Sequence, residues 1–85
     1  MMVRHNVENF PNWKTVYDEH VYARKQSGLK DLYLLKNVTN QNDVTLLFEI
    51  EDLAKAKTFA ESENLHEAMK ESGVIGAPEI FFYKA

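Results

Sequence analysis

The 85-residue sequence contains no cysteine, only two prolines and only three glycines. The absence of cysteine excludes disulfide bonds and thiolate chemistry. No repeat, low-complexity tract or linker divides the chain, so we expect a single domain over residues 1–85. Chains this short often gain stability from disulfides, a bound metal or a partner subunit, and the first of these is excluded.

The sequence also lacks an excess of basic charge and any long apolar run. Ten Lys and Arg side chains stand against thirteen Asp and Glu, and no basic stripe of the kind that binds nucleic acid is visible. No stretch approaches the about 20 apolar residues that a membrane-spanning helix needs, and the first residues lack the apolar core of a signal peptide. We therefore expect a cytoplasmic protein that binds neither nucleic acid nor membrane.

Motifs for metal and phosphate binding are weak. Glu63 and His66 have the Glu-x-x-His spacing of di-iron helix bundles, but such sites need further carboxylates from facing helices. The residues 73–76 lack the lysine and the strand–loop–helix context of a P-loop. We expect no metal and no cofactor.

Hydrophobic residues make up 45% of the chain, which argues against disorder. Residues 2–7 alternate in polarity as in a β-strand, with Val3, His5 and Val7 on one face. Apolar residues at three- and four-residue steps then predict an amphipathic helix that ends at Gly28. Its apolar face comprises Phe10, Trp13, Val16, Tyr17 and Val21.

The rest of the sequence predicts two further strands, a second helix and a last strand. Two strands are expected at residues 29–38 and 44–51, joined by a polar turn at residues 39–43. Asp52 suits the N-cap of a second helix, which runs to Gly73 with a break at residues 62–64. A last strand, apolar on both faces, is expected at residues 79–83.

The order strand, helix, strand, strand, helix, strand predicts a ferredoxin-like α+β plait (βαββαβ): a four-stranded antiparallel sheet with its helices on one face. Several strands are nevertheless apolar on both faces. Leu32 and Leu34 alternate with Tyr33 and Leu35, and Ile80 and Phe82 alternate with Phe81 and Tyr83. An apolar sheet face without helices is too large a patch to leave in water, so we expect a homodimer that pairs sheet against sheet.

The chain resembles the dimeric α/β-barrel superfamily, and more narrowly its short bacterial members related to antibiotic-biosynthesis-type monooxygenases and polyketide cyclases. The resembling stretches are residues 3–7 leading into 10–14, 51–53, 67–74 and 78–79. The resemblance implies a pocket between the helices and the sheet of each subunit. Haem degradation in this superfamily needs an Asn, a Trp and a His together, and the single tryptophan, Trp13, lies in the first helix, which argues against that activity.

His5 is the first candidate for catalysis. The resemblance to plant polyketide cyclases of this superfamily, which carry a catalytic histidine on the first strand, implies such a role, although their partner residues have no match here. A half-buried imidazole can take a proton from a phenol or from a carbon next to a carbonyl. The alternative is a histidine that serves packing alone.

Five further residues complete the candidate site. Tyr17 and His20 are candidates for stabilising an anion and for carrying a second proton, while Trp13, Phe59 and Tyr83 are candidates for the substrate pocket. The alternative is an aromatic core stripe, since amphipathic faces are chiefly packing. Tyr83 has the dimer face as a further option.

Two functions remain open at this stage. The first is a cofactor-independent monooxygenase or cyclase that acts on a small aromatic or polyketide-like compound with His5 as base. The second is a non-catalytic dimer that binds a small hydrophobic molecule or serves in a stress response. An open cavity that reaches His5 would favour the first function, and a filled gap with His5 bonded to protein would favour the second.

Overall fold

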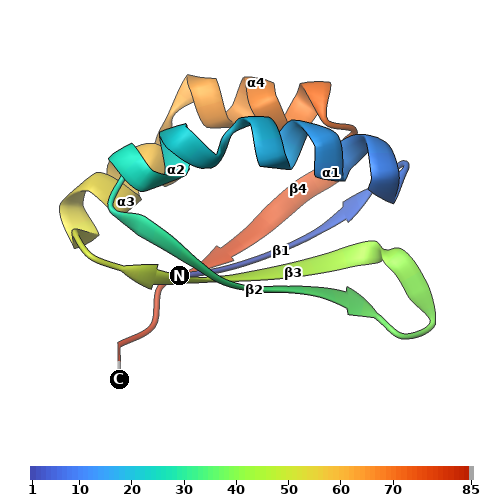
Figure 1. Cartoon of the computed structure of the whole chain (residues 1–85), viewed down its shortest axis with the longest axis horizontal. Coiled ribbons are helices and arrows are strands. Elements are labelled where there is room, and N and C mark those ends of the chain that lie inside the picture. Colours follow the sequence, from blue (N-terminus) through green and yellow to red (C-terminus); the bar gives the residue numbers. More distant parts are fainter. Residues whose placement is uncertain (85) are drawn as a thin grey trace.

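The computed structural model describes residues 1–84 and contains one four-stranded antiparallel sheet with four helices on one of its faces (Figure 1). The elements are β1 (Met2–Val7), α1 (Phe10–Glu19), α2 (Val21–Gln26), β2 (Leu29–Asn37), β3 (Asn40–Ile50), α3 (Leu53–Glu61), α4 (Glu63–Glu71) and β4 (Val74–Phe81). The strands lie in the order β2-β3-β1-β4. The predicted ferredoxin-like fold is therefore confirmed. Among the described residues, no helix is long and apolar enough to cross a membrane.

Each of the two predicted helices is divided in two. The break at residues 62–64 is confirmed: Ser62 has extended backbone angles, and its side chain accepts a hydrogen bond from the backbone N–H of Leu65 at the start of α4. The break at His20, between α1 and α2, was not predicted. There ψ is 14°, outside the helical range, and the ring Nδ1 of His20 lies 2.8 Å from the carbonyl oxygen of Val16.

Two strand boundaries differ from the prediction. The turn between β2 and β3 consists of two residues, because Asn37 pairs with Asn40 and its side chain accepts hydrogen bonds from the backbone and hydroxyl of Thr39. The last strand begins at Val74 rather than at residue 79. Pro78 fits within it because β4 is an edge strand and its register shifts opposite the segment from Arg4 to Asn6.

The core lies between the helices and the sheet. It is formed by side chains that point toward the helices from the two central strands, together with residues of the helices. Its buried members include Val3, Val7, Val44, Leu46, Phe48, Trp13 and Ala56. The alternation predicted for β1 is confirmed, and it places the side chain of His5 in this layer.

The opposite sheet face carries no helix among the described residues (Figure 1). Tyr33, Ile75 and Phe81 lie on it and are exposed, as their pairing with outward-facing partners shows. The predicted alternation in β2 is wrong in one respect: a register shift between Asp31 and Tyr33 leaves Leu32 unpaired, so Leu32 does not simply share the inward face of Leu34.

Candidate active site

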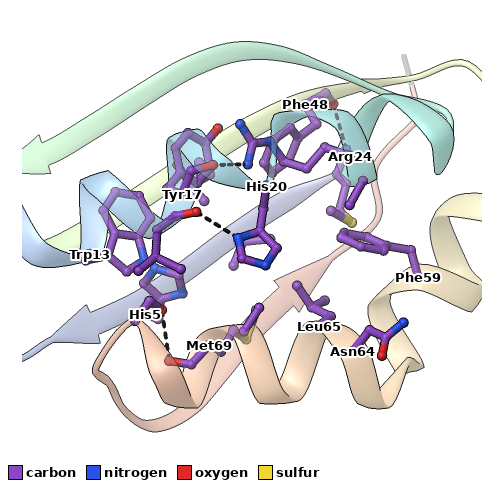
Figure 2. A pocket seen from close by; sticks show the side chains of 17 residues that line it. His5, Trp13, Tyr17, His20, Arg24, Phe48, Phe59, Asn64, Leu65 and Met69 are labelled. Atoms are coloured by element: carbon purple, nitrogen blue, oxygen red, sulfur yellow. Dashed lines mark hydrogen bonds between the residues drawn. The ribbon is translucent and has the colours of Figure 1, made fainter.

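A cavity of about 100 Å³ lies between the sheet and the helices (Figure 2). Strands β1 and β3 form one wall, α1 and α2 form a second, and α4 with the end of α3 forms a third. Five of the six residues expected in the site line it. These are His5, Trp13, Tyr17, His20 and Phe59. The fold therefore brings together residues from positions 5 to 59 of the chain.

Tyr83 lies outside this cavity. The residue lies beyond the end of β4 and is 65% exposed, and its ring stacks against Phe81 with centroids 6.1 Å apart. The expected pocket residue at this position is therefore placed with the sheet face that carries no helix. Tyr83 follows a strand whose Phe81 points away from the helices.

His5 is held in the wall of the cavity by β1, where it pairs with Val44 of β3. Only 5% of the residue is exposed, and the Trp13 ring meets the imidazole edge-on, with centroids 5.5 Å apart. Within residues 1–84, neither ring nitrogen of His5 has a hydrogen-bond partner. A buried polar group without a hydrogen-bond partner costs free energy, so a bound molecule that forms a hydrogen bond with this imidazole would remove that cost.

Burial lowers the pKa of His5 from 6.5 to about 4. The cause is loss of solvation, which disfavours the charged imidazolium. At neutral pH the ring is therefore uncharged, with one nitrogen that accepts a hydrogen bond and one that donates. A neutral imidazole is the form that can accept a proton from a bound molecule.

Trp13 and Tyr17 form an aromatic wall from successive turns of α1. Their rings are stacked with centroids 4.9 Å apart and planes at 21°. The pKa of Tyr17 is raised to about 12, mainly because the hydroxyl is buried. The hydroxyl therefore keeps its proton at neutral pH. In Figure 2 this hydroxyl points away from His5, and the carboxylate of Asp31 is among the further causes of the raised pKa.

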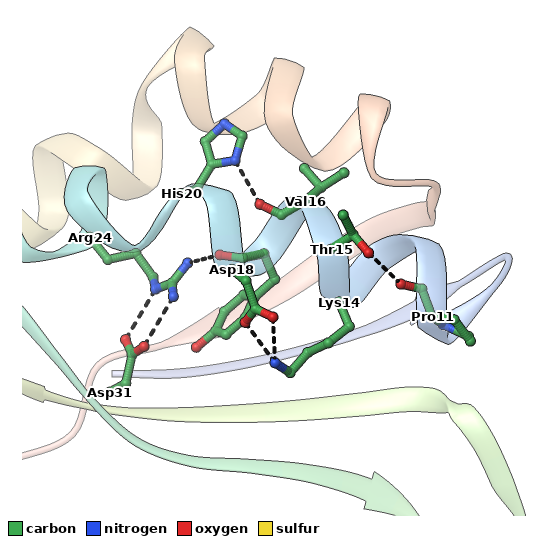
Figure 3. Close-up of polar contacts among 9 residues, drawn as sticks. Pro11, Lys14, Thr15, Val16, Asp18, His20, Arg24 and Asp31 are labelled. Carbon is green, nitrogen blue, oxygen red and sulfur yellow. Dashed lines mark hydrogen bonds and ion pairs between the residues drawn. The ribbon is translucent and has the colours of Figure 1, made fainter.

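Arg24 is a charged lining residue that the sequence did not indicate as part of the site. It is buried, and its Nε and Nη2 donate to the two carboxylate oxygens of Asp31 at 3.1 and 3.0 Å (Figure 3). Nη1 donates to the carbonyl oxygen of Tyr17 at 2.6 Å, and the guanidinium carbon lies 3.7 Å from the centroid of the Tyr17 ring. The available signal was an arginine on an apolar helix face, seven residues before an aspartate.

His20 faces the cavity from the break between α1 and α2 (Figures 2 and 3). Its ring Nδ1 lies 2.8 Å from the carbonyl oxygen of Val16. A carbonyl only accepts hydrogen bonds, so Nδ1 carries the proton of this contact. His5 and His20 thus present two imidazole rings to one apolar space.

The far wall comes from α4, which the sequence did not single out. Asn64, Leu65 and Met69 face the cavity from this helix, together with Ser72 at its end. The hydroxyl of Ser72 donates to the carbonyl oxygen of Met69, so it is already engaged. The helical spacing of Leu65 and Met69 is typical of core positions, and only the packing of α4 across from α1 makes them part of the cavity wall.

No group of three or more metal-ligating side chains exists within residues 1–84. His66 is exposed on α4 and does not line the cavity. The Glu63–His66 spacing therefore has no further ligands around it in the described part of the chain.

Comparisons with known proteins place the fold. No family model matches the chain, and no curated protein sequence matches it significantly. A crystal structure of an antibiotic biosynthesis monooxygenase superposes with a TM-score of 0.68 at 13% sequence identity, over 99% of this chain and 94% of that one. A putative antibiotic biosynthesis monooxygenase from Nitrosomonas europaea has a TM-score of 0.62 at 11% identity, over 92% of this chain and 87% of that one. The resemblance in fold that the sequence predicted is confirmed by these two structures, and the low identities make it a statement about fold alone.

Proposed function

We propose that this chain is a small enzyme that binds an aromatic compound in the cavity and uses His5 as a base on it. The observation that carries the proposal is the buried imidazole in the cavity wall, with both ring nitrogens unpartnered among the described residues. An apolar cavity lined by Trp13 and Phe59 supplies the surface for an aromatic ring. The fold shared with two structures titled as antibiotic biosynthesis monooxygenases supports a reaction of that kind.

The proposed reaction is a cofactor-independent oxygenation. His5 accepts the proton of a bound phenol or enol, and the resulting anion is oxidised by dioxygen, which enters as the second substrate. For a phenol, one oxygen atom becomes the second carbonyl of a quinone. The other leaves as water together with the phenolic hydrogen and one ring hydrogen. Atoms and electrons balance without any further reductant.

The other lining residues have distinct roles in this proposal. His20 lines the cavity with its Nδ1 engaged by the carbonyl oxygen of Val16, and it serves as the second proton carrier. Tyr17 contributes its ring to the wall that excludes water, since its hydroxyl points away from His5. Arg24 is a positioning residue, because it holds the carbonyl and the ring of Tyr17 while its own charge is neutralised by Asp31.

A second candidate function is supported by the low basicity of His5. The pKa of His5 is about 4, whereas the ordinary pKa of a phenol is about 10. Transfer of a proton from a phenol to this imidazole is therefore strongly unfavourable. The same imidazole forms a good hydrogen bond to an intact hydroxyl. A non-catalytic dimer that binds a small hydrophobic molecule is therefore the alternative.

The assembly in both functions is a homodimer through the sheet face that carries no helix among the described residues. Tyr33 is 64% exposed on this face and Ile75 is 52% exposed, from opposite edge strands of the sheet. Charged groups on the same face are mixed in sign, as in the ion pair of Arg4 with Asp43, so a second copy meets no excess of like charge. Burial of these apolar side chains is what stabilises the proposed dimer.

Oxygen uptake and quinone absorbance, measured over a panel of phenols and quinols, test the enzymatic proposal. The His5→Ala variant should lose turnover by about 10²–10⁴-fold, the typical contribution of a general base. His66→Ala is the matched control, because His66 is exposed and away from the cavity. Full turnover in His5→Ala would exclude His5 as the base, and binding without turnover across the panel would favour the non-catalytic alternative.

A further inference from the structure

The size of the cavity limits its ligand. Its volume is about 100 Å³, and an apolar protein cavity of about 150 Å³ is known to hold one benzene molecule. The space is smaller than that cavity but is not fully enclosed, so one six-membered ring with a small substituent already fills it. A fused system of three rings is too large for it unless the walls move apart.

The polar groups of the wall define where a substituent would point. The ring nitrogens of His5 are the buried side-chain nitrogen or oxygen atoms without a hydrogen-bond partner among residues 1–84. A neutral imidazole offers one acceptor and one donor, so a ligand hydroxyl or ring N–H satisfies it. Trp13, Phe48 and Phe59 supply the apolar surface around this point.

The charges around the cavity favour an uncharged ligand. Arg24 carries the one permanently charged side chain among the described lining residues, and Asp31 already binds it through two hydrogen bonds. His5 and His20 are the other basic side chains that line the cavity. The ammonium group of Met1, another lining residue, already donates to the carbonyl oxygen of Phe48. An anionic ligand would therefore lose its hydration and find both cations already engaged, which disfavours its binding.

We infer that this cavity binds an uncharged, single-ring aromatic compound that carries one O–H or ring N–H, hydrogen-bonded to His5. The inference deepens the proposed function by naming the substrate class for the same site. It narrows that class from aromatic or polyketide-like compounds to single rings. It depends on the cavity and on His5 as a hydrogen-bonding partner, and it requires no turnover.

Binding measured by calorimetry with phenol, benzene and anthrone tests the inference on the full chain. Phenol and benzene match in ring size and differ by the hydroxyl, while anthrone has three fused rings. We expect phenol to bind about tenfold more tightly than benzene, as one net hydrogen bond predicts, and anthrone to show no saturable binding. Equal affinities of phenol and benzene, or tighter binding of anthrone, would overturn the inference, as would no binding of phenol.

Two substitutions assign the hydrogen bond. His5→Phe keeps a ring in the wall and removes both nitrogens, so the preference for phenol over benzene should vanish. His66→Phe makes the same chemical change on the exposed face of α4 and should keep the tenfold preference. A preference retained in His5→Phe would contradict the assignment.

The unsubstituted protein gives a second measurement in case His5→Phe does not fold. The ¹⁵N chemical shifts of the His5 ring should change on addition of phenol and stay unchanged with benzene. Identical responses to the two probes would overturn the inference independently of any variant.

The inference and the proposed function fail in different ways. Phenol binding at His5 without turnover of any phenol would leave the inference standing and exclude the enzyme. Turnover of a fused-ring substrate, with no binding of phenol, would leave the enzyme standing and exclude the single-ring ligand.

Discussion

The imidazole of His5 meets the edge of the Trp13 indole, with ring centroids 5.5 Å apart and the two planes at 72°. His5 lies on β1, one of the two central strands of the sheet, and Trp13 lies near the start of α1. Both are buried, and the contact leaves the imidazole nitrogens without a hydrogen-bond partner in the described structure. This pair links the packing of the core to the polarity of the cavity.

The stability of the protein should depend on pH through His5. Because burial lowers its pKa from 6.5 to about 4, the unfolded chain binds more protons than the folded chain between these values. The free energy of unfolding is therefore fully retained above about pH 6.5 and falls as the pH decreases toward 4. The loss attributable to His5 is about 3 kcal/mol.

Denaturant unfolding at pH 7.5 and 4.5, compared between the unsubstituted protein and His5→Phe, isolates this effect. Tyr17, His20 and Arg24 are the other titratable side chains that line the same cavity, and they are present in both proteins. The variant should lose less stability between the two pH values. An identical loss in both proteins would show that His5 does not titrate with a lowered pKa.

The ion pair of Arg24 with Asp31 should contribute more than a surface pair. The Arg24 side chain is 7% exposed and that of Asp31 is 41% exposed, so Asp31→Asn leaves a buried cation without its counter-ion. We expect Asp31→Asn to lower the free energy of unfolding by about 1–3 kcal/mol. Asp18→Asn, which breaks the exposed pair of Lys14 with Asp18, should change the free energy of unfolding by less than about 0.5 kcal/mol.

Urea unfolding of the two variants at low and high salt provides the measurement. Salt should weaken the small effect of Asp18→Asn and leave most of the effect of Asp31→Asn, since burial limits screening. Equal losses in the two variants would show that the buried guanidinium is satisfied without Asp31.

Gly28 should tolerate no side chain. Its φ is +73°, and an added Cβ would lie 2.9 Å from the Cβ of Asp52, the residue whose carboxylate caps α3. Gly28→Ala should therefore cost more than the about 1–2 kcal/mol of the left-handed conformation alone. Gly76→Ala is the matched control, because its φ is +71° and open space surrounds the site of its Cβ.

Thermal and denaturant unfolding of both alanine variants separates the two costs. The difference between them measures the contact with Asp52, since the backbone conformations are nearly the same. Equal destabilisation would mean that β2 and the start of α3 move apart at little cost.

Much of the fold was predictable because it rests on local patterns. Alternation in residues 2–7 placed His5 in the core layer, Asp52 marked the start of the second predicted helix, and polar residues 62–64 marked its break. Each of these patterns lies within a few residues of the chain. They can therefore be recognised without knowledge of the tertiary structure.

The missed features depend on distant contacts. Arg24 is buried because Asp31 reaches it from β2, and a sequence pattern does not show that an arginine will find its counter-ion. The last strand was expected to begin after Pro78, yet Pro78 lies inside β4. An edge strand tolerates a proline, and only the sheet topology reveals that β4 is at the edge. Tyr83 was assigned to the pocket on residue type alone and lies outside the cavity.

The sheet face that carries Tyr33 should mediate a dimer. We expect sedimentation equilibrium at micromolar concentration to give about twice the chain mass of 9.9 kDa.

Tyr33→Glu puts a charge among the apolar side chains of this face and should give a folded monomer, because burying the carboxylate against a second copy is costly. Tyr22→Glu is the control: Tyr22 is 68% exposed on α2, on the opposite side of the molecule, and its variant should remain a dimer. Circular dichroism confirms that each variant is folded. A stable monomer of the unsubstituted chain would contradict the proposed interface, and dissociation by Tyr22→Glu instead of Tyr33→Glu would move it to the helices.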